Sequence, residues 1–137
     1  MFRQPPAALA ILVVAFNSKV FGLHASTGAK VWRHEVGGAV AVRAIVHGGI
    51  VLALGSALVA IEYATGRLLW RTEVDPTLSA GTLVAAGQLV FIADAGEAAA
   101  FDVGTGRQLW REGFAGEGMG VVALALPGAA AQGDRSG

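Results

Sequence analysis

The sequence predicts an all-β protein, a partial β-propeller of about three four-stranded antiparallel blades. The main observation is a repeat in which Thr-Gly is followed four residues later by Trp. It occurs three times, and its tryptophans, Trp32, Trp70 and Trp110, are the only three in the 137-residue chain. Their spacing of roughly 40 residues, with strand-like sequence between them, is typical of propeller blades.

A second observation argues against a helical repeat of similar length. The chain contains 20 glycines, and no segment maintains the apolar i, i+3, i+4, i+7 pattern of an amphipathic helix. Short runs of aliphatic and β-branched residues are separated by Gly, Asn, Ser and Asp, which indicates strands joined by tight turns. We therefore expect hairpins rather than helix pairs.

The strands can be placed by aligning the three copies. The first strand of each copy is short and apolar, and is expected at 11–16, 50–54 and 89–93. The second ends in a polar side chain and is expected at 19–24, 57–62 and 97–102. The third carries the Trp and is expected at 30–36, 67–74 and 107–114. A further strand fits the remaining intervals, at 40–46 and 82–86.

The expected propeller arc covers residues 1–126. Its blades lie at roughly 8–36, 40–74 and 80–114, followed by a partial strand at 119–126 and a flexible tail at 127–137. Three blades do not close a propeller, which typically has about 4–8. Neither end resembles the polar cap with which repeat arrays cover their terminal faces. We therefore expect two bare faces. Either a protein partner or copies of the chain itself complete a ring, or the chain is a fragment of a longer propeller.

Composition excludes several classes of function. Hydrophobic residues make up 54% of the chain and charged residues 15%, and the formal net charge is zero. Without a basic excess, binding to nucleic acid or to an anionic membrane surface is disfavoured. The absence of cysteine excludes disulfides and thiolate metal sites.

Two features of the sequence bear on targeting: an apolar segment near the N-terminus and the length of the apolar runs. The apolar segment 7–16 resembles the core of a signal peptide, but its register within the repeat favours a buried strand. No apolar run is long enough to predict a transmembrane helix. The sequence therefore leaves the compartment open.

The recurring residues suit contacts between blades. The Gly of each Thr-Gly permits positive φ in the turn, and the Thr hydroxyl can accept a hydrogen bond from a nearby amide. A Trp on the third strand can lay its ring on the neighbouring blade while its indole N–H reaches a carbonyl. The predicted blade-docking residues are Thr27, Gly28, Trp32, Thr65, Gly66, Trp70, Thr105, Gly106 and Trp110.

Other polar residues are assigned structural roles. Arg33, Arg71 and Arg111 follow the tryptophans, and are expected to form a charged outer strand that discourages edge pairing. The three histidines, His24, His34 and His47, lack metal-ligand spacing. The carboxylates Asp94 and Asp102 already have turn positions, and Glu97 lies between them. We expect no catalytic, cofactor-binding or metal-binding residue.

The repeat resembles the quinoprotein-type, or pyrroloquinoline-quinone (PQQ)-like, β-propeller family. The family's motif is Ala-(Leu/Val)-Asp-x-x-Thr-Gly-x-x-x-Trp, and the resemblance covers about residues 9–114. The copies here begin Gly22-Leu23-His24, Ala60-Ile61-Glu62 and Ala100-Phe101-Asp102, and end at the three tryptophans. The resemblance implies a quinoprotein-like propeller, usually working outside the cytoplasm, in the periplasm or at the cell surface.

The same resemblance implies several functions. The family includes quinone-dependent alcohol dehydrogenases, outer-membrane assembly lipoproteins and sensor domains of kinases. Its dehydrogenases typically place adjacent cysteines and a calcium-bound catalytic Asp around the cofactor, and this chain has no cysteine. We expect a non-catalytic scaffold for protein–protein interaction or self-assembly, without a cofactor. The alternatives are a fragment of a PQQ-dependent dehydrogenase and an extracytoplasmic ligand-sensing domain.

Overall fold

The computed structural model describes residues 10–38, 42–118, 120, 122–127 and 130–132. Its regular elements are strands, apart from one turn of 3-10 helix. They are β1 (Ile11–Phe16), β2 (Lys19–His24), β3 (Lys30–Glu35), β4 (Arg43–His47), β5 (Ile50–Leu54), β6 (Ala57–Glu62), β7 (Leu68–Glu73), η2 (Pro76–Leu78), β8 (Thr82–Ala86), β9 (Leu89–Asp94), β10 (Glu97–Asp102), β11 (Gln108–Glu112) and β12 (Ala130–Gln132).

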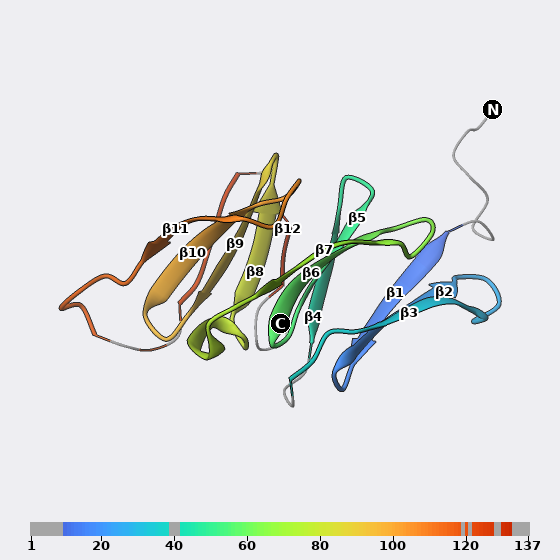
Figure 1. The fold of residues 1–137 in the computed structure, drawn as a ribbon, viewed down its shortest axis with the longest axis horizontal. Coiled ribbons are helices and arrows are strands. Elements are labelled where there is room, and N and C mark those ends of the chain that lie inside the picture. Colours follow the sequence, from blue (N-terminus) through green and yellow to red (C-terminus); the bar gives the residue numbers. More distant parts are fainter. Residues whose placement is uncertain (1–9, 39–41, 119, 121, 128–129, 133–137) are drawn as a thin grey trace.

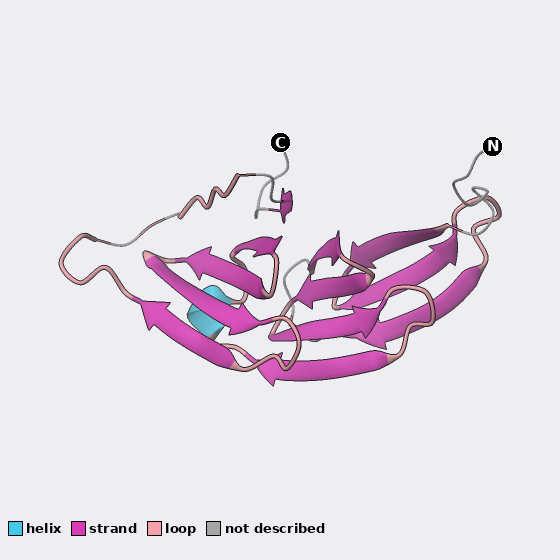
Figure 2. Ribbon diagram, turned by 90° about the horizontal axis from the view of Figure 1, so that it is seen from above, coloured by secondary structure: helices cyan, strands magenta, loops and turns pink. Residues whose placement is uncertain are grey.

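The strands form three antiparallel sheets that lie side by side (Figure 1). The first sheet has the order β1-β2-β3, the second β4-β5-β6-β7 and the third β11-β10-β9-β8-β12. Seen from above, the three sheets follow one another along a curved row (Figure 2). The predicted fold class, a partial β-propeller of antiparallel blades, is confirmed.

Tight turns set the register of the hairpins. Asn17 and Ala95 adopt positive φ, at 56° and 51°, between the strands that they connect. This left-handed conformation is what a two-residue hairpin turn requires, and Asn tolerates it better than most residues. In all three sheets the register also shifts beside the Trp-bearing strand, after Gly22, Ala60 and Ala100. These small residues are the cross-strand partners of Trp32, Trp70 and Trp110.

The C-terminal region differs from the prediction. The described residues 122–126 of the predicted partial strand 119–126 form no strand. They follow Gly116, Gly118 and Gly120, whose φ values of 83°, 105° and 143° are incompatible with regular strand geometry. The segment instead crosses the outer face of the third sheet.

The predicted flexible tail also needs correction. Within 127–137, residues 130–132 form β12, which pairs antiparallel with β8. The physical reason is that β8 is the edge strand of its blade, so its free main-chain groups can accept one more strand. The remaining tail residues 128–129 and 133–137, and residues 40 and 41 of the predicted strand 40–46, lie outside the described residues.

The core consists of two apolar clusters, one at each junction between sheets. Fully buried aliphatic side chains from facing strands supply most of both clusters. The cluster between the first and second sheets contains Val20, Trp32, Val36, Val42, Val51, Ala53, Val59 and Ile61. The cluster between the second and third contains Ile45, Leu52, Leu54, Leu58, Ala60, Leu78, Leu83, Ala85, Val90, Ile92, Ala99, Phe101 and Val103. Stability therefore depends on sheet-to-sheet packing, as in other repeat architectures.

Candidate docking surface

The junction between the first two sheets is built around Trp32. Its side chain is only 7% exposed, and its indole N–H donates to the carbonyl of Tyr63 at 3.1 Å. The ring lies so close to Gly66 that an added Cβ there would overlap it. Two residues further along β3, the His34 ring donates to the Gly66 carbonyl at 2.5 Å. A Trp of one blade thus sits on the Thr-Gly turn of the next.

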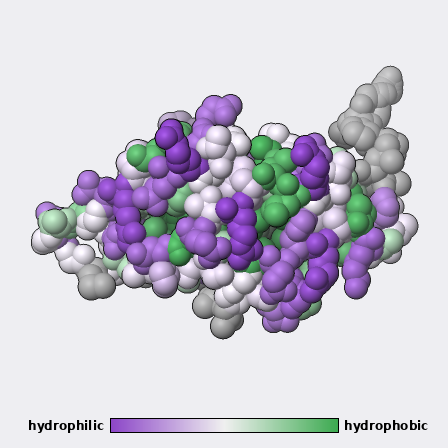
Figure 3. All heavy atoms as spheres, in the orientation of Figure 1, coloured by the Kyte–Doolittle hydropathy of each residue, from purple (hydrophilic) through white to green (hydrophobic). Residues whose placement is uncertain are grey.

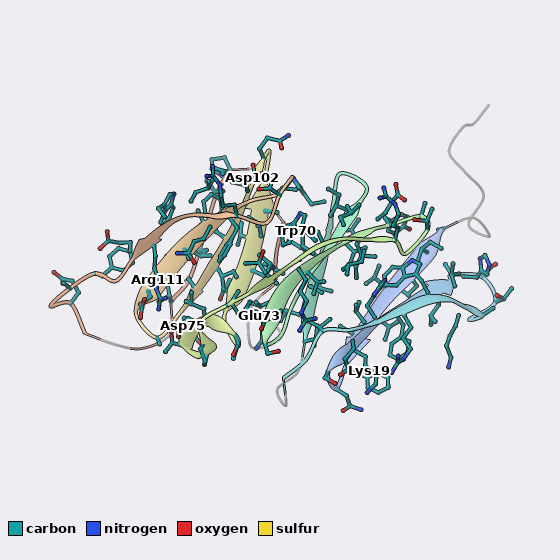
Figure 4. The ribbon with its side chains drawn as sticks, in the orientation of Figure 1. Lys19, Trp70, Glu73, Asp75, Asp102 and Arg111 are labelled. Carbon is teal, nitrogen blue, oxygen red and sulfur yellow. The ribbon has the colours of Figure 1, made fainter. Side chains whose placement is uncertain are left out.

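The second junction repeats this arrangement. Trp70 donates from its indole N–H to the Val103 carbonyl at 2.7 Å. An added Cβ at Gly106 would overlap the Trp70 ring. Thr72 takes the place of His34, and its hydroxyl donates to the Gly106 carbonyl at 2.6 Å. The repeat therefore encodes one junction with three parts: an indole, a second donor two residues later, and a glycine turn that receives both (Figure 4, Trp70).

The Thr residues stabilise the turns from within. The hydroxyls of Thr27, Thr65 and Thr105 each accept a hydrogen bond, at 3.2 Å, from the amide two residues later. Asp102 accepts from both the amide and the hydroxyl of Thr105. Glu62 accepts from the Thr65 hydroxyl, and that bond holds the pKa of Glu62 below its usual range. The side chain of His24, in the same position of the first copy, makes no such bond to a described residue.

The arginines after the tryptophans have a role that the sequence analysis missed. Arg71 donates to the main-chain carbonyls of Glu35, the last residue of β3, and of Val36, the first residue after it, at 3.3 and 3.2 Å. Arg111 binds Asp75 at 3.1 Å in the next linker and also contacts Glu97. Figure 4 shows Arg111 and Asp75 lying close together. These side chains fasten the linkers between blades, in addition to charging the outer strands.

This linker contact also shifts two pKa values. Hydrogen bonds from Thr77, followed by one from Arg111, lower the pKa of Asp75. Hydrogen bonds to Glu97 and then Asp75 raise the pKa of Arg111. Arg33 has no preceding linker of this kind among the described residues, and its ion pair is with Glu35 on its own strand, at 3.8 Å.

The two ends of the arc each carry half a junction. Trp110 is 47% exposed, and its indole N–H donates to no described residue. At the other end, an added Cβ on Gly28 would meet no atom within 4 Å, although the φ of Gly28 is 78°, like that of Gly66 and Gly106. The Thr-Gly turn of the first blade therefore receives no indole in this chain.

The outer face of the first sheet is open and apolar. Leu12 and Phe16 are each 53% exposed. Beside them Val14, Phe21 and Leu23 line a groove of about 270 Å³ that also contacts Gly28, Lys30 and Phe16. Apolar groups also show among the polar ones in the right half of Figure 3, which holds the first two sheets.

Strand register shows what this face corresponds to in the second blade. Leu12 pairs with Leu23 as Val51 pairs with Ile61, and Val14 pairs with Phe21 as Ala53 pairs with Val59. In the second blade these four positions are completely or almost completely buried against the first blade. In the first blade, no described blade packs on the same positions. We call Leu12, Val14, Phe16, Phe21 and Leu23 the N-terminal face.

The opposite end is not bare, contrary to the expectation from the sequence. Residues 124–126 lie against Val84 and Phe91 on the outer face of the third sheet, where they line a common pocket of about 190 Å³. The Gly96 amide donates to the Gly120 carbonyl at 2.9 Å, and the Thr82 hydroxyl to the Val122 carbonyl at 3.3 Å. Val84 is consequently only 1% exposed. The segment is apolar, so its capping role could not be recognised from polarity.

The family of the chain follows from comparison with known proteins. A family model described as "Outer membrane protein assembly factor BamB" matches residues 8–135. The chain belongs to this BamB family. No curated protein sequence matches it.

Solved structures agree on the fold. BamB from Moraxella catarrhalis superposes with a TM-score of 0.59 and is 23% identical, over 75% of this chain and 33% of that chain. The quinohemoprotein alcohol dehydrogenase ADHIIG from Pseudomonas putida superposes with a TM-score of 0.57 and is 23% identical, over 74% of this chain and 19% of that chain. The quinohemoprotein alcohol dehydrogenase from Comamonas testosteroni superposes with a TM-score of 0.55 and is 20% identical, over 76% of this chain and 19% of that chain. The chain thus spans about a third of the BamB structure and a fifth of each dehydrogenase.

Among residues 10–38, 42–118, 120, 122–127 and 130–132, no group of three or more His, Cys, Asp or Glu side chains could hold a metal ion. Two of the histidines are engaged elsewhere, because His34 bonds to the Gly66 carbonyl and His47 to the Gly87 carbonyl. No helix in the described part of the chain is long and apolar enough to cross a membrane.

Proposed function

We propose that this BamB-family chain is a non-catalytic docking module, which binds another polypeptide through its N-terminal face. One observation carries the proposal: four apolar positions that are buried between blades in the second blade are accessible on the first, where Leu12 is 53% exposed and Val14, Phe21 and Leu23 are partly exposed. Exposed apolar patches of this kind mark interaction sites. The rim of the face is polar, with Lys19, Lys30 and Arg33 nearby, as is common around the apolar centre of an interface.

The competing dehydrogenase function rests on fold alone. The quinohemoprotein alcohol dehydrogenases are 23% identical to this chain or less. At that identity the similarity supports a shared fold and carries no information about a shared reaction. In our proposal the chain binds neither PQQ nor calcium. Adding PQQ with Ca²⁺ and following thermal unfolding separates the two functions, because a ligand that binds only the folded state raises the unfolding temperature. A rise at micromolar PQQ would contradict the proposal.

Family membership also suggests where the module works. We propose a location outside the cytoplasm, in keeping with the outer-membrane assembly factor after which the family is named. Fractionation of cells that express the protein tests this directly. Recovery with the cytoplasmic fraction would contradict it.

Site-specific photo-crosslinking tests the docking face. A photoreactive phenylalanine analogue replaces Phe16 in one variant and Leu68 in a matched control, because both are about half exposed but Leu68 lies on β7, away from the face. The proposal predicts a discrete crosslinked polypeptide from position 16 that disappears when Leu12→Glu is added. Equal products from both positions, or none from position 16, would contradict docking through this face.

A further inference from the structure

We propose that the N-terminal face binds the third blade of a second copy of this chain, head to tail, through the junction that already joins blades within it. This inference rests on the proposed docking function and names its partner. Each copy carries one incomplete junction at each end, and the two incomplete halves are complementary. The contact is heterologous, since different surfaces of the two copies meet.

The hydrogen-bonding groups match the two internal junctions. Trp110 carries an indole N–H that donates to no described residue. In the internal junctions the acceptor is the carbonyl three residues before the glycine of the turn, Tyr63 or Val103. The corresponding residue of the first turn is Ala25, which precedes Gly28 by the same distance. Docking would therefore place an indole over Gly28, with the Ala25 carbonyl as its acceptor.

The apolar surfaces match as well. In the first junction the inner residues of β1 pack against Val51 and Val59 of the second blade. Phe91 of β9 has the position of an inner β1 residue, while Leu12 and Phe21 have the positions of Val51 and Val59. A second copy would thus bury Leu12 and Phe21 against the third blade. Burial of these apolar side chains is the main favourable contribution to the contact.

Charge favours this pairing over the contact of two identical faces. In the third blade, Glu112 lies two residues after the Trp, where His34 and Thr72 act as the second donor in the other two blades. Its carboxylate accepts a hydrogen bond from the Phe114 amide. It cannot donate to the Gly28 carbonyl, but Lys30 lies beside Gly28 in the same groove and carries the opposite charge. Two N-terminal faces placed together would instead bring Lys30 of each copy to one interface, and like charges disfavour such contacts.

The capping segment 122–126 competes with the second copy. Its residues 124–126 cover Val84 and Phe91, where the incoming first blade would pack. Among the described residues, the Gly96 amide donates to the carbonyl of Gly120, just before this segment, and the Thr82 hydroxyl donates to the carbonyl of Val122 within it. Self-association therefore requires this segment to move, and we expect it to be concentration-dependent rather than obligate.

Two complementary variants test the proposal. Trp110→Ala removes the docking indole, and Leu12→Glu places a carboxylate on the N-terminal face opposite Glu112. Both residues are about half exposed, so both variants are expected to fold, which circular dichroism checks. Light scattering coupled to size exclusion then gives the mass of the wild type, of each variant and of their equimolar mixture. Trp110→Ala retains the N-terminal face and Leu12→Glu retains the docking indole, so each variant keeps the half of the junction that the other has lost.

The head-to-tail contact predicts four results. The wild-type mass rises with concentration, each variant alone stays monomeric, and the mixture forms a dimer that grows no further. A wild type that is monomeric at all concentrations, or a monomeric mixture, overturns the proposal. So does association of Trp110→Ala with itself, since that would mean that two N-terminal faces meet.

Failure here can be told apart from failure of the docking function. If the chain does not self-associate but position 16 crosslinks to a different polypeptide, the face docks another protein and only its identity as a second copy is wrong. If neither occurs, both proposals fall. A crosslinked product of twice the chain mass, absent in Trp110→Ala, supports both.

Discussion

Trp32 and Trp110 occupy the same position in the repeat, yet their environments differ sharply. Trp32 is 7% exposed and donates to a carbonyl of the next blade, whereas Trp110 is 47% exposed and donates to no described residue. The strands that carry them pair in the same way with β2 and β10. The difference therefore comes from the blade that follows Trp32, and not from the repeat itself.

The two ends of the arc extend this comparison. The outer face of the third sheet is covered by residues 122–126, and Val84 beneath them is 1% exposed. The outer face of the first sheet has no such cover among the described residues, and Leu12 is 53% exposed. A repeat protein is stabilised by contacts between neighbours, so a missing neighbour leaves its energetic contribution unrealised. In our proposal, a partner supplies this contribution at the N-terminal face.

The largest expected effect separates the two tryptophans. Trp32→Ala removes a buried ring and a hydrogen bond, and should lower the free energy of unfolding by about 3–5 kcal/mol. Trp110→Ala removes a half-exposed ring that contacts Phe91, and should cost about 1 kcal/mol. Urea unfolding at a concentration where the chain is monomeric measures both. Equal losses of unfolding free energy in the two variants would contradict the contrast between the docked Trp32 and the exposed Trp110.

The glycines on which the tryptophans dock provide a second contrast. Gly66→Ala and Gly28→Ala both place a Cβ at nearly the same positive φ, 79° and 78°, which costs about 1–2 kcal/mol. Only Gly66→Ala also overlaps the Trp32 ring, and such overpacking costs a further 1–3 kcal/mol or so. The difference between the two variants in free energy of unfolding therefore measures the contribution of the close contact between Trp32 and Gly66. Equal destabilisation would show that the close Trp–Gly approach is unimportant.

The arginines should show a smaller difference. Arg71→Gln removes hydrogen bonds to the Glu35 and Val36 carbonyls and should cost about 1 kcal/mol. Arg33→Gln, which loses a long ion pair on an exposed strand, should change stability by less than about 0.5 kcal/mol. Thermal unfolding of the two variants compares them. A larger loss for Arg33→Gln would mean that outer-strand charge, and not attachment of the linker, is what these arginines contribute.

The smallest effect concerns pH. Hydrogen bonds lower the pKa of Asp75 from its ordinary 3.8 in the folded state, so its ionised form stabilises the fold. This contribution is complete above the ordinary value and is lost as pH falls through the lowered one. Asp75→Asn should therefore flatten the acid side of the stability profile. Urea unfolding at a series of acidic pH values measures this slope, and an Asp75→Asn slope equal to that of the wild type would contradict the role of Asp75.

The fold could be predicted because its determinants are local. The Thr-Gly turn and the Trp four residues later recur in register, and this predicted the class and the family of the chain. The partners of those residues could not be predicted, because they are distant in sequence: Arg71 reaches a carbonyl 36 residues away. The segment 122–126 was interpreted as a strand because its Val, Ala and Leu residues suit a strand and an apolar cover equally well.

Fluorine NMR of the chain labelled with fluorotryptophan tests the central claim most directly. The chain has three tryptophans and should give three resonances, of which Trp110→Phe identifies one. The account predicts that the Trp110 resonance alone responds to solvent at low concentration and shifts as concentration rises, while those of Trp32 and Trp70 stay constant. A Trp110 resonance that is buried at every concentration, or a Trp32 resonance that shifts with it, would contradict the division between filled and open junctions.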